Sequence, residues 1–324
     1  MSERTVRVAL VGCGRWGLRL GSALARLPGV EVAALVDRDP CALAAAAATA
    51  PGALRFPELG ALCASGPTLD AAIVATPSPL HARHGLALLR AGLDVLVEKP
   101  LATTLAAART LASEARRLGR VGMAGHVLRY HPGFERLIEL GRSGALGRLR
   151  GLWARRLTRS GSTSPLWTLA PHDLATLHAL DPSVVRRVEL ARCASGPAEP
   201  TAPIELRVEL ASGLEATLVL STDAAVAERL TRLTGSEGAA WLDELALDAP
   251  LLCAAATGGP TRPVAVERGE PLLRELEPFA SSVRYRTEPR TSFAEALFTV
   301  DVLERAERAL EAARAPLSDG PAPP

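Results

Sequence analysis

Asparagine and glutamine are absent from this 324-residue sequence, and lysine occurs only once, at position 99. The rest of its 37 basic residues are arginines. A coding bias toward arginine explains the arginines but not why one lysine remains at this position. A guanidinium stays charged at any working pH, whereas an ammonium group can become neutral when burial or a neighbouring charge disfavours its proton. Lys99 is therefore a candidate for proton transfer before any motif is considered.

Membrane-length apolar runs, paired cysteines and a strong charge excess are missing as well. The N-terminus shows no signal-peptide pattern, since strand-like residues begin at once, so we expect a cytoplasmic protein. A net charge of +2 argues against partners such as nucleic acid or an anionic membrane surface. The cysteines stand singly without CxxC spacing, which argues against a disulfide framework and predicts no metal site. They are Cys13, Cys41, Cys63, Cys193 and Cys253.

The order of the apolar runs predicts an α/β protein with two domains. Over residues 1–124, strand-like and helical segments alternate, which predicts a doubly wound parallel sheet of the Rossmann type that binds a dinucleotide. Residues 125–316 carry several strand-like runs with few helices, which predicts an α/β domain with a largely antiparallel open sheet, for substrate binding and oligomerisation. In Ile204–Leu210 apolar and charged residues alternate, so this strand has one polar face. The Pro-rich residues 317–324 are expected to form a disordered tail.

A glycine motif follows the first predicted strand. Gly12, Gly14 and Gly17 form GxGxxG where a helix begins, the pattern that lets a backbone approach a pyrophosphate. Asp37 ends the next strand, twenty residues beyond Gly17, where a carboxylate accepts ribose hydroxyls and repels a 2′-phosphate. We therefore expect NAD, with NADP less favoured, although Arg38 weakens this preference. The cofactor contacts predicted here are Gly12, Gly14, Arg15, Trp16, Gly17, Asp37 and Arg38.

The segment AIVATPSPLHARHGLALLRAGLDVLVEKPLATT resembles the Gfo/Idh/MocA family, the glucose-fructose oxidoreductase and inositol dehydrogenase group. Together with VGCGRWG, GHVLRYHP and LWTLAPHDL, the resemblance runs from residue 6 to about 180. It implies that Glu98 and Pro100 fix a turn in which Lys99 points at the nicotinamide and the reacting oxygen. Further cofactor contacts implied by the resemblance are Thr76, Pro77, His81, Glu98 and Lys99.

The same resemblance implies an activity: NAD-dependent hydride transfer at a secondary alcohol or ketone of a sugar-like small molecule. The LW-x-L-x-PHDL segment is most similar to the branch that contains nucleotide-sugar dehydrogenases, so a nucleotide-linked substrate is among the candidates. A homo-oligomer, dimer or tetramer, is expected. The alternative is a non-catalytic module or regulator that senses NAD(P) on the same fold.

His172 matches the family histidine that acts with the lysine as an acid or base, a role that suits a neutral imidazole near pH 7. The family pattern has an aspartate four residues earlier, where this chain has Thr168. Either Lys99 alone carries the proton transfer, or Asp173 or Tyr130 compensates, or the chemistry differs. For the stretch 126–131, where the chain enters the second domain, substrate contact and simple packing between the domains remain equal alternatives. The predicted substrate contacts are His126, Arg129, Tyr130, Thr168 and Asp173.

Overall fold

The structure, a computed structural model, describes residues 4–159, 164–193, 203–246, 250–256 and 260–314. The chain forms two compact units, Met1–Arg136 with Val266–Asp301, and Leu137–Ala265 with Val302–Pro324. The sequence predicted a single domain boundary after residue 124, whereas each of these units consists of two separate segments of the chain. The reason is helix α8 (Pro271–Tyr285), which packs on α1 and β1 and so returns a late segment to the first unit. The predicted tail, 317–324, lies outside the described residues.

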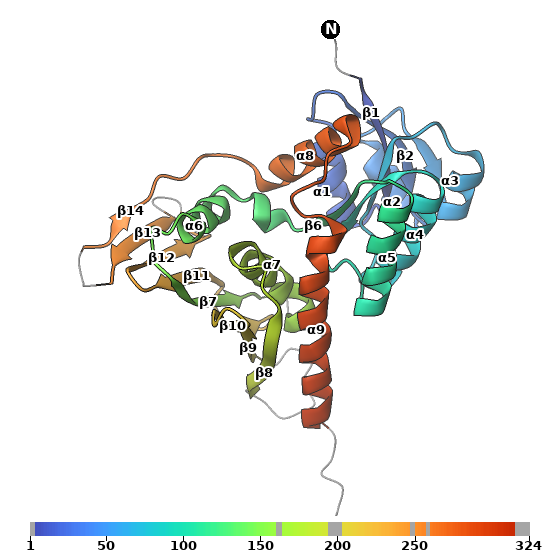
Figure 1. Cartoon of the computed structure of the whole chain (residues 1–324). Helices are drawn as coiled ribbons and strands as arrows, with labels where there is room; N and C mark the ends of the chain where they lie inside the picture. The colour runs from blue at the N-terminus through green and yellow to red at the C-terminus, as the bar shows by residue number, and fades with distance from the viewer. Residues whose placement is uncertain (1–3, 160–163, 194–202, 247–249, 257–259, 315–324) are drawn as a thin grey trace, which may run out of the picture. The chain divides into compact units, whose positions relative to one another are not determined.

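The first unit is built on a six-stranded parallel sheet in the order β3-β2-β1-β4-β5-β6 (Figure 1). Its strands are β1 (Val6–Val11), β2 (Val30–Val36), β3 (Leu54–Phe56), β4 (Ala71–Val74), β5 (Asp94–Glu98) and β6 (Gly122–Gly125). All of its pairings are parallel, and central strands such as β4 are buried throughout, which explains their unbroken apolar sequences. The order reverses between β1 and β4, the position where such sheets bind ligands beyond the carboxyl ends of their strands. The predicted doubly wound domain is confirmed.

Helices cover both faces of this sheet. One face packs against a buried cluster that includes residues of α1, α2 and α8, and the other against residues of α3, α4 and α5 and the start of α9. The bounds are α1 (Arg15–Leu24), α2 (Pro40–Ala47), α3 (Leu59–Ser65), α4 (His81–Arg90), α5 (Leu105–Arg117) and α9 (Phe293–Arg314). Short 3-10 turns η1 (Ser78–Leu80) and η2 (Val127–Tyr130) and helix α6 (Pro132–Arg142) complete this part of the chain.

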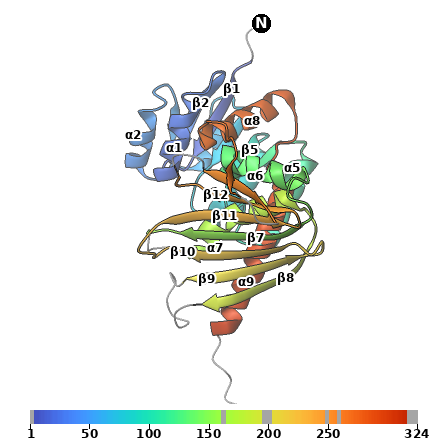
Figure 2. The same ribbon diagram turned by 90° about the vertical axis from the view of Figure 1, so that its left-hand side faces the viewer.

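The second unit is built on an eight-stranded sheet, β14-β13-β12-β11-β7-β10-β9-β8 (Figure 2). Among the described strands of this second sheet, only β7 and β10 pair in parallel, which confirms a largely antiparallel open sheet. Its strands are β7 (Leu149–Leu157), β8 (Val185–Cys193), β9 (Ile204–Leu210), β10 (Glu215–Ser221), β11 (Glu228–Gly235), β12 (Gly238–Asp243), β13 (Leu251–Ala255) and β14 (Arg262–Pro263). In β9 the expected alternation holds, with Ile204, Leu206, Val208 and Leu210 buried.

Helix α7 (Pro165–Leu180), which contains His172, packs against β7 and β10. Most of its residues are buried, so its sequence is apolar nearly all round and carries little helical periodicity. Among the described helices of both units, none is long and apolar enough to cross a membrane.

Candidate active site

The glycine loop after β1 has the geometry that a dinucleotide needs. Gly12 has φ +97°, and a Cβ there would lie 2.6 Å from the backbone of Ala75. A Cβ at Gly17 would lie 2.0 Å from the carbonyl oxygen of Gly12, so the first turn of helix α1 packs directly on the loop. At Gly14, in contrast, a Cβ would meet nothing within 4 Å, and no side chain caps the helix. The loop therefore leaves an open approach to the helix N-terminus, where a pyrophosphate would bind.

The two kinds of glycine predict different defects. Gly12→Ala is expected to lower the free energy of unfolding by about 2 kcal/mol or more, because the left-handed conformation and the contact with Ala75 both disfavour a Cβ. Gly14→Val should change stability by less than about 1 kcal/mol yet weaken NADH binding at least tenfold, because its side chain would fill the open approach. Thermal unfolding and fluorescence titration with NADH measure both. Unchanged NADH affinity in Gly14→Val would contradict the assignment.

Asp37 lies at the end of β2 beside this loop. Its Oδ2 accepts a hydrogen bond from the backbone N–H of Cys13 at 2.7 Å, and its Oδ1 accepts one from Asp39 at 2.9 Å. Both bonds fix the carboxylate next to the glycine loop, while the neighbouring Arg38 is exposed. Burial, reinforced by Asp37, raises the pKa of Cys13 to about 12, so this thiol stays protonated. The position of Asp37 fits the acidic residue that binds a ribose.

Lys99 follows β5 at the same carboxyl edge of the sheet as the glycine loop and Thr76. Since β1, β4 and β5 are neighbours, the turns after them lie side by side, at strand spacings of about 4.8 Å. Glu98 fixes the Lys99 turn: its Oε2 accepts from the Lys99 backbone N–H at 3.1 Å, and its Oε1 accepts from Trp16 Nε1 at 2.5 Å. Burial raises the pKa of Glu98 to about 7, although the Trp16 hydrogen bond favours the ionised form.

His81 supports the site from behind. It is 1% exposed, its Nδ1 lies 2.7 Å from the carbonyl oxygen of Pro100, and its Nε2 lies 2.7 Å from that of Thr76. The ring thus bridges the loop after β4 and the turn after β5, and its burial lowers its pKa. A direct contact between His81 and the cofactor was expected, but both of its ring nitrogens lie within hydrogen-bonding distance of these two backbone carbonyl oxygens. Pro77, next to Thr76, starts the short helix η1.

Three predicted substrate contacts lie inside the first unit. His126, Arg129 and Tyr130 are only 4%, 6% and 1% exposed. Arg129 Nη1 lies 2.6 Å from Glu295 Oε1, and Tyr130 Oη lies 3.1 Å from Thr291 Oγ1. Burial raises the pKa of Tyr130 to about 12. Tyr130 is therefore a packed, protonated phenol, and the expectation that it could compensate for the missing aspartate is not met.

In the second unit, Thr168 and His172 lie one turn apart on α7 and are both partly exposed. Asp173 points the other way and is buried. Arg156 of β7 binds it through Nε–Oδ2 and Nη2–Oδ1 contacts of 3.1 and 2.9 Å. Arg156 Nη1 also lies 2.8 Å from Glu244 Oε1. Asp173 was predicted to contact the substrate. In the structure its carboxylate instead binds Arg156, as part of a buried ion-pair cluster with Glu244.

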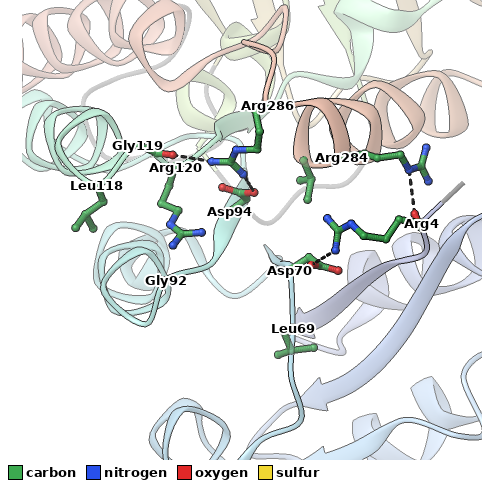
Figure 3. Close-up of a pocket in the computed structure, with 11 residues that line it drawn as sticks. Arg4, Leu69, Asp70, Gly92, Asp94, Leu118, Gly119, Arg120, Arg284 and Arg286 are labelled. Carbon is green, nitrogen blue, oxygen red and sulfur yellow. Dashed lines mark hydrogen bonds and ion pairs between the residues drawn. The ribbon is translucent and has the colours of Figure 1, made fainter.

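A cavity of about 400 Å³ opens at the opposite edge of the parallel sheet, where its strands begin (Figure 3). Two ion pairs lie among its lining residues: Arg4 Nη1 lies 2.5 Å from Asp70 Oδ1, and Arg286 binds Asp94 and also the carbonyl oxygen of Gly119. These contacts tie the end of α8 to the sheet. The cavity lies far along the strands from Lys99 and plays no part in the site described above.

Comparison with known proteins agrees with this geometry. Residues 6–126 match the GFO_IDH_MocA model, an oxidoreductase family with an NAD-binding Rossmann fold. A 4-carboxy-2-hydroxymuconate-6-semialdehyde dehydrogenase from a Sphingobium species is 28% identical over 67% of this chain and 71% of that protein. An inositol 2-dehydrogenase from Leifsonia xyli is 32% identical over 64% of each chain. Another, from Saccharopolyspora erythraea, is 36% identical, but the match spans only 42% of that protein.

Solved structures cover nearly the whole chain. A UDP-N-acetylglucosamine 3-dehydrogenase from Acidithiobacillus ferrooxidans has a TM-score of 0.85 at 22% identity, over 96% of this chain and 99% of that one. An aldose-aldose oxidoreductase from Caulobacter crescentus has a TM-score of 0.83 at 21% identity, over the same shares. A Rossmann unit with a parallel sheet and a second unit with a largely antiparallel sheet together define a two-domain dinucleotide-binding fold. Residues 6–126 match the Gfo/Idh/MocA oxidoreductase family, as the resemblance predicted, and the NAD-binding Rossmann unit is confirmed.

Proposed function

We propose that this protein transfers a hydride between NAD and a secondary alcohol or ketone carbon of a sugar or polyol, with Lys99 exchanging the proton of the reacting oxygen. The observation that carries the proposal is the placement of Lys99. It follows β5 in the row of turns that also contains the glycine loop, and the turn is held by Glu98 and by His81. When bound, NAD accepts or supplies the hydride.

In this proposal, different side chains transfer the proton, contact the substrate and hold the Lys99 turn. Oxidation of an alcohol requires loss of the O–H proton, and a lysine amine beside the buried Glu98 carboxyl can accept it. His172, partly exposed on α7, is the second acid or base in the proposal, with Thr168 one turn away as a substrate contact. Glu98, Trp16 and His81 touch no reacting atom and hold the Lys99 turn in place.

The named relatives suggest the substrate class. An inositol and a nucleotide-linked amino sugar both present secondary hydroxyls on a ring, and the dehydrogenases named for them are similar to this chain. We therefore propose a cyclic polyhydroxylated substrate, free or nucleotide-linked. Cytoplasmic location and a homo-oligomer remain predictions. The alternative of a non-catalytic NAD(P) sensor gains some support from Asp173, whose carboxylate cannot replace the missing aspartate because Arg156 occupies it.

The test is binding followed by turnover. Purified protein is titrated with NADH and NADPH by fluorescence, and then offered NAD with inositols, aldoses and UDP-sugars while NADH absorbance is followed. The proposal expects NADH binding and turnover of at least one ring polyol. Tight NADH binding without turnover of any compound, in both the oxidative and the reductive direction, would favour the sensor instead.

Asp37 is expected to set the cofactor preference. Asp37→Asn keeps a side-chain oxygen for the Cys13 N–H but removes the charge that repels a 2′-phosphate. The ratio of NADPH to NADH dissociation constants should fall about tenfold, close to 1.4 kcal/mol. Asp39→Asn, which neutralises an exposed acid two residues further on, is the matched control and should leave the ratio unchanged. Equal ratios in wild type and Asp37→Asn would contradict this role.

A further inference from the structure

The cavity of about 400 Å³ at the edge where the parallel strands begin lies wholly within the first unit (Figure 3). Small-molecule sites range from roughly 300 to 1,000 Å³, so this volume is enough for a ligand. Among the described residues that line the cavity, the charged ones are four arginines and two aspartates, an excess of two positive charges. They are Arg4, Arg120, Arg284 and Arg286, with Asp70 and Asp94.

The two aspartates are occupied by the sheet edge itself. Each uses one oxygen in the ion pair described above and the other for a backbone N–H. Asp70 Oδ2 accepts from the N–H of Arg7 at 2.9 Å, and Asp94 Oδ1 accepts from that of Val121 at 2.8 Å. Burial would raise the pKa of Asp70, but the Arg7 N–H and the ion pair lower it below its usual value. Neither carboxylate therefore leaves an oxygen without a partner.

Arg120 differs from the other arginines of the cavity. It lies half-buried in the turn between α5 and β6, with its Nη2 near Gly92, where an added Cβ would be 3.5 Å away. Within the part of the chain that the structure describes, its guanidinium makes no hydrogen bond or ion pair. A guanidinium has five N–H donors and keeps its charge, so in this cavity it needs acceptors from water or from a ligand.

The other arginines hold segments of the first unit together. Arg284 donates to two backbone carbonyl oxygens, at 3.0 and 3.2 Å. Arg286 donates to the carbonyl oxygen of Gly119, just after α5, and so meets the partial negative charge at that helix end. Arg120 makes no comparable bond within the described residues, so capping of a helix end does not explain it.

A second cavity, of about 480 Å³, shares Gly119, Arg120 and Arg286 with the first. It continues along α5 to Phe293 at the start of α9, within the same unit. Because Arg120 lines both cavities, a ligand whose anionic group contacts this guanidinium has room for its remaining atoms.

We propose that the two cavities form a binding site for a small phosphate ester, with Arg120 binding its phosphate group. An excess of two positive charges matches a phosphate dianion, and the planar guanidinium fork binds two phosphate oxygens at once. The second cavity accepts the organic part of the ester. The site lies at the opposite edge of the sheet from Lys99 and the glycine loop, and it does not rest on the proposed function.

Binding is tested by calorimetric titration of the full chain with glycerol 3-phosphate at constant ionic strength, with sulfate and glycerol as comparison probes. The proposal expects saturable binding of the ester, weaker binding of sulfate, which lacks the organic part, and none of glycerol. The thermal unfolding midpoint should rise by about 2 °C or more at saturating ester. No saturable binding below about 10 mM, or equal affinity for sulfate and ester, would reduce the site to an adventitious ion only and overturn the proposal.

Arg120→Met should weaken binding of glycerol 3-phosphate by about tenfold or more, because it removes the contact to two phosphate oxygens. Arg109→Met removes an exposed arginine of α5 that lines neither cavity, and as the matched control it should bind like the wild type. Ester binding that survives Arg120→Met but is lost in Gly14→Val would place the ester at the glycine loop and overturn the assignment.

The unliganded variant separates ligand binding from a structural role of Arg120. Since this side chain has no partner among the described residues, Arg120→Met should unfold at the wild-type temperature or above it when no phosphate is present. A midpoint clearly below that of the wild type and of Arg109→Met would show that Arg120 stabilises the turn itself, and would overturn its assignment to a ligand.

Discussion

Replacement of Lys99 by arginine is expected to lower kcat/KM for alcohol oxidation about a thousandfold, as much as replacement by methionine. General acid–base catalysis contributes about 10² to 10⁴ in rate, and an arginine keeps the charge but cannot release a proton at working pH. The Glu98 contact to residue 99 runs through the backbone, so either variant can keep the turn. The dissociation constant of NADH should change less than threefold. Stopped-flow or steady-state NADH absorbance measures the rate.

The pair of variants separates two roles of Lys99. If its charge alone polarised the oxygen, Lys99→Arg would keep a tenth or more of the wild-type kcat/KM while Lys99→Met lost it. Arg83→Met, on the exposed face of α4, is the control for loss of a basic residue in the same unit and should be fully active. High activity in Lys99→Met together with normal NADH binding would contradict any catalytic role for this residue.

Local sequence was enough to predict the Rossmann unit. Its central strands are largely buried on both faces, so they read as mostly apolar runs, and the turns that follow them at the carboxyl edge carry recognisable motifs. Gly12, Asp37, Thr76 and Lys99 each follow one of these strands, at the carboxyl edge of the sheet. The alternation in β9 likewise revealed a half-buried strand. These features depend on neighbours within one element or one βαβ unit.

Features that depend on distant partners could not be predicted. Strands β11 to β14 are partly exposed, with weak patterns of apolar residues. The return of α8 to the first unit and the cavity that contains Arg120 depend on packing between segments far apart in sequence. Trp16 and Glu98 are 82 positions apart, and no periodicity relates them. Asp173 follows His172 in a recognised motif, yet only the tertiary structure shows that Arg156 occupies its carboxylate.

Disruption of the ion-pair cluster formed by Arg156, Asp173 and Glu244 is expected to have the largest effect on stability. The Arg156 and Glu244 side chains are 5% exposed and that of Asp173 is 0% exposed, so Arg156→Met leaves two buried carboxylates without their main counter-charge. Breaking a buried ion pair on one side costs about 3–5 kcal/mol, and we expect a loss of that size in the free energy of unfolding at pH 7.5. Arg155→Met, on the same strand, removes an arginine whose side chain is 43% exposed, and should cost less than about 1 kcal/mol.

The pH dependence of this loss tests its electrostatic cause. Burial already raises the pKa of Glu244, and Arg156 opposes that rise, so the pKa of Glu244 should climb further in Arg156→Met. A carboxyl whose folded pKa exceeds its unfolded value destabilises the fold only once it must ionise, as pH rises above the unfolded value of about 4. The loss should therefore shrink between pH 7.5 and pH 5, and Asp173→Asn with Glu244→Gln should restore part of it at pH 7.5. Urea unfolding at both pH values measures this, and a loss equal at pH 5 and pH 7.5 would point to lost packing of the arginine instead.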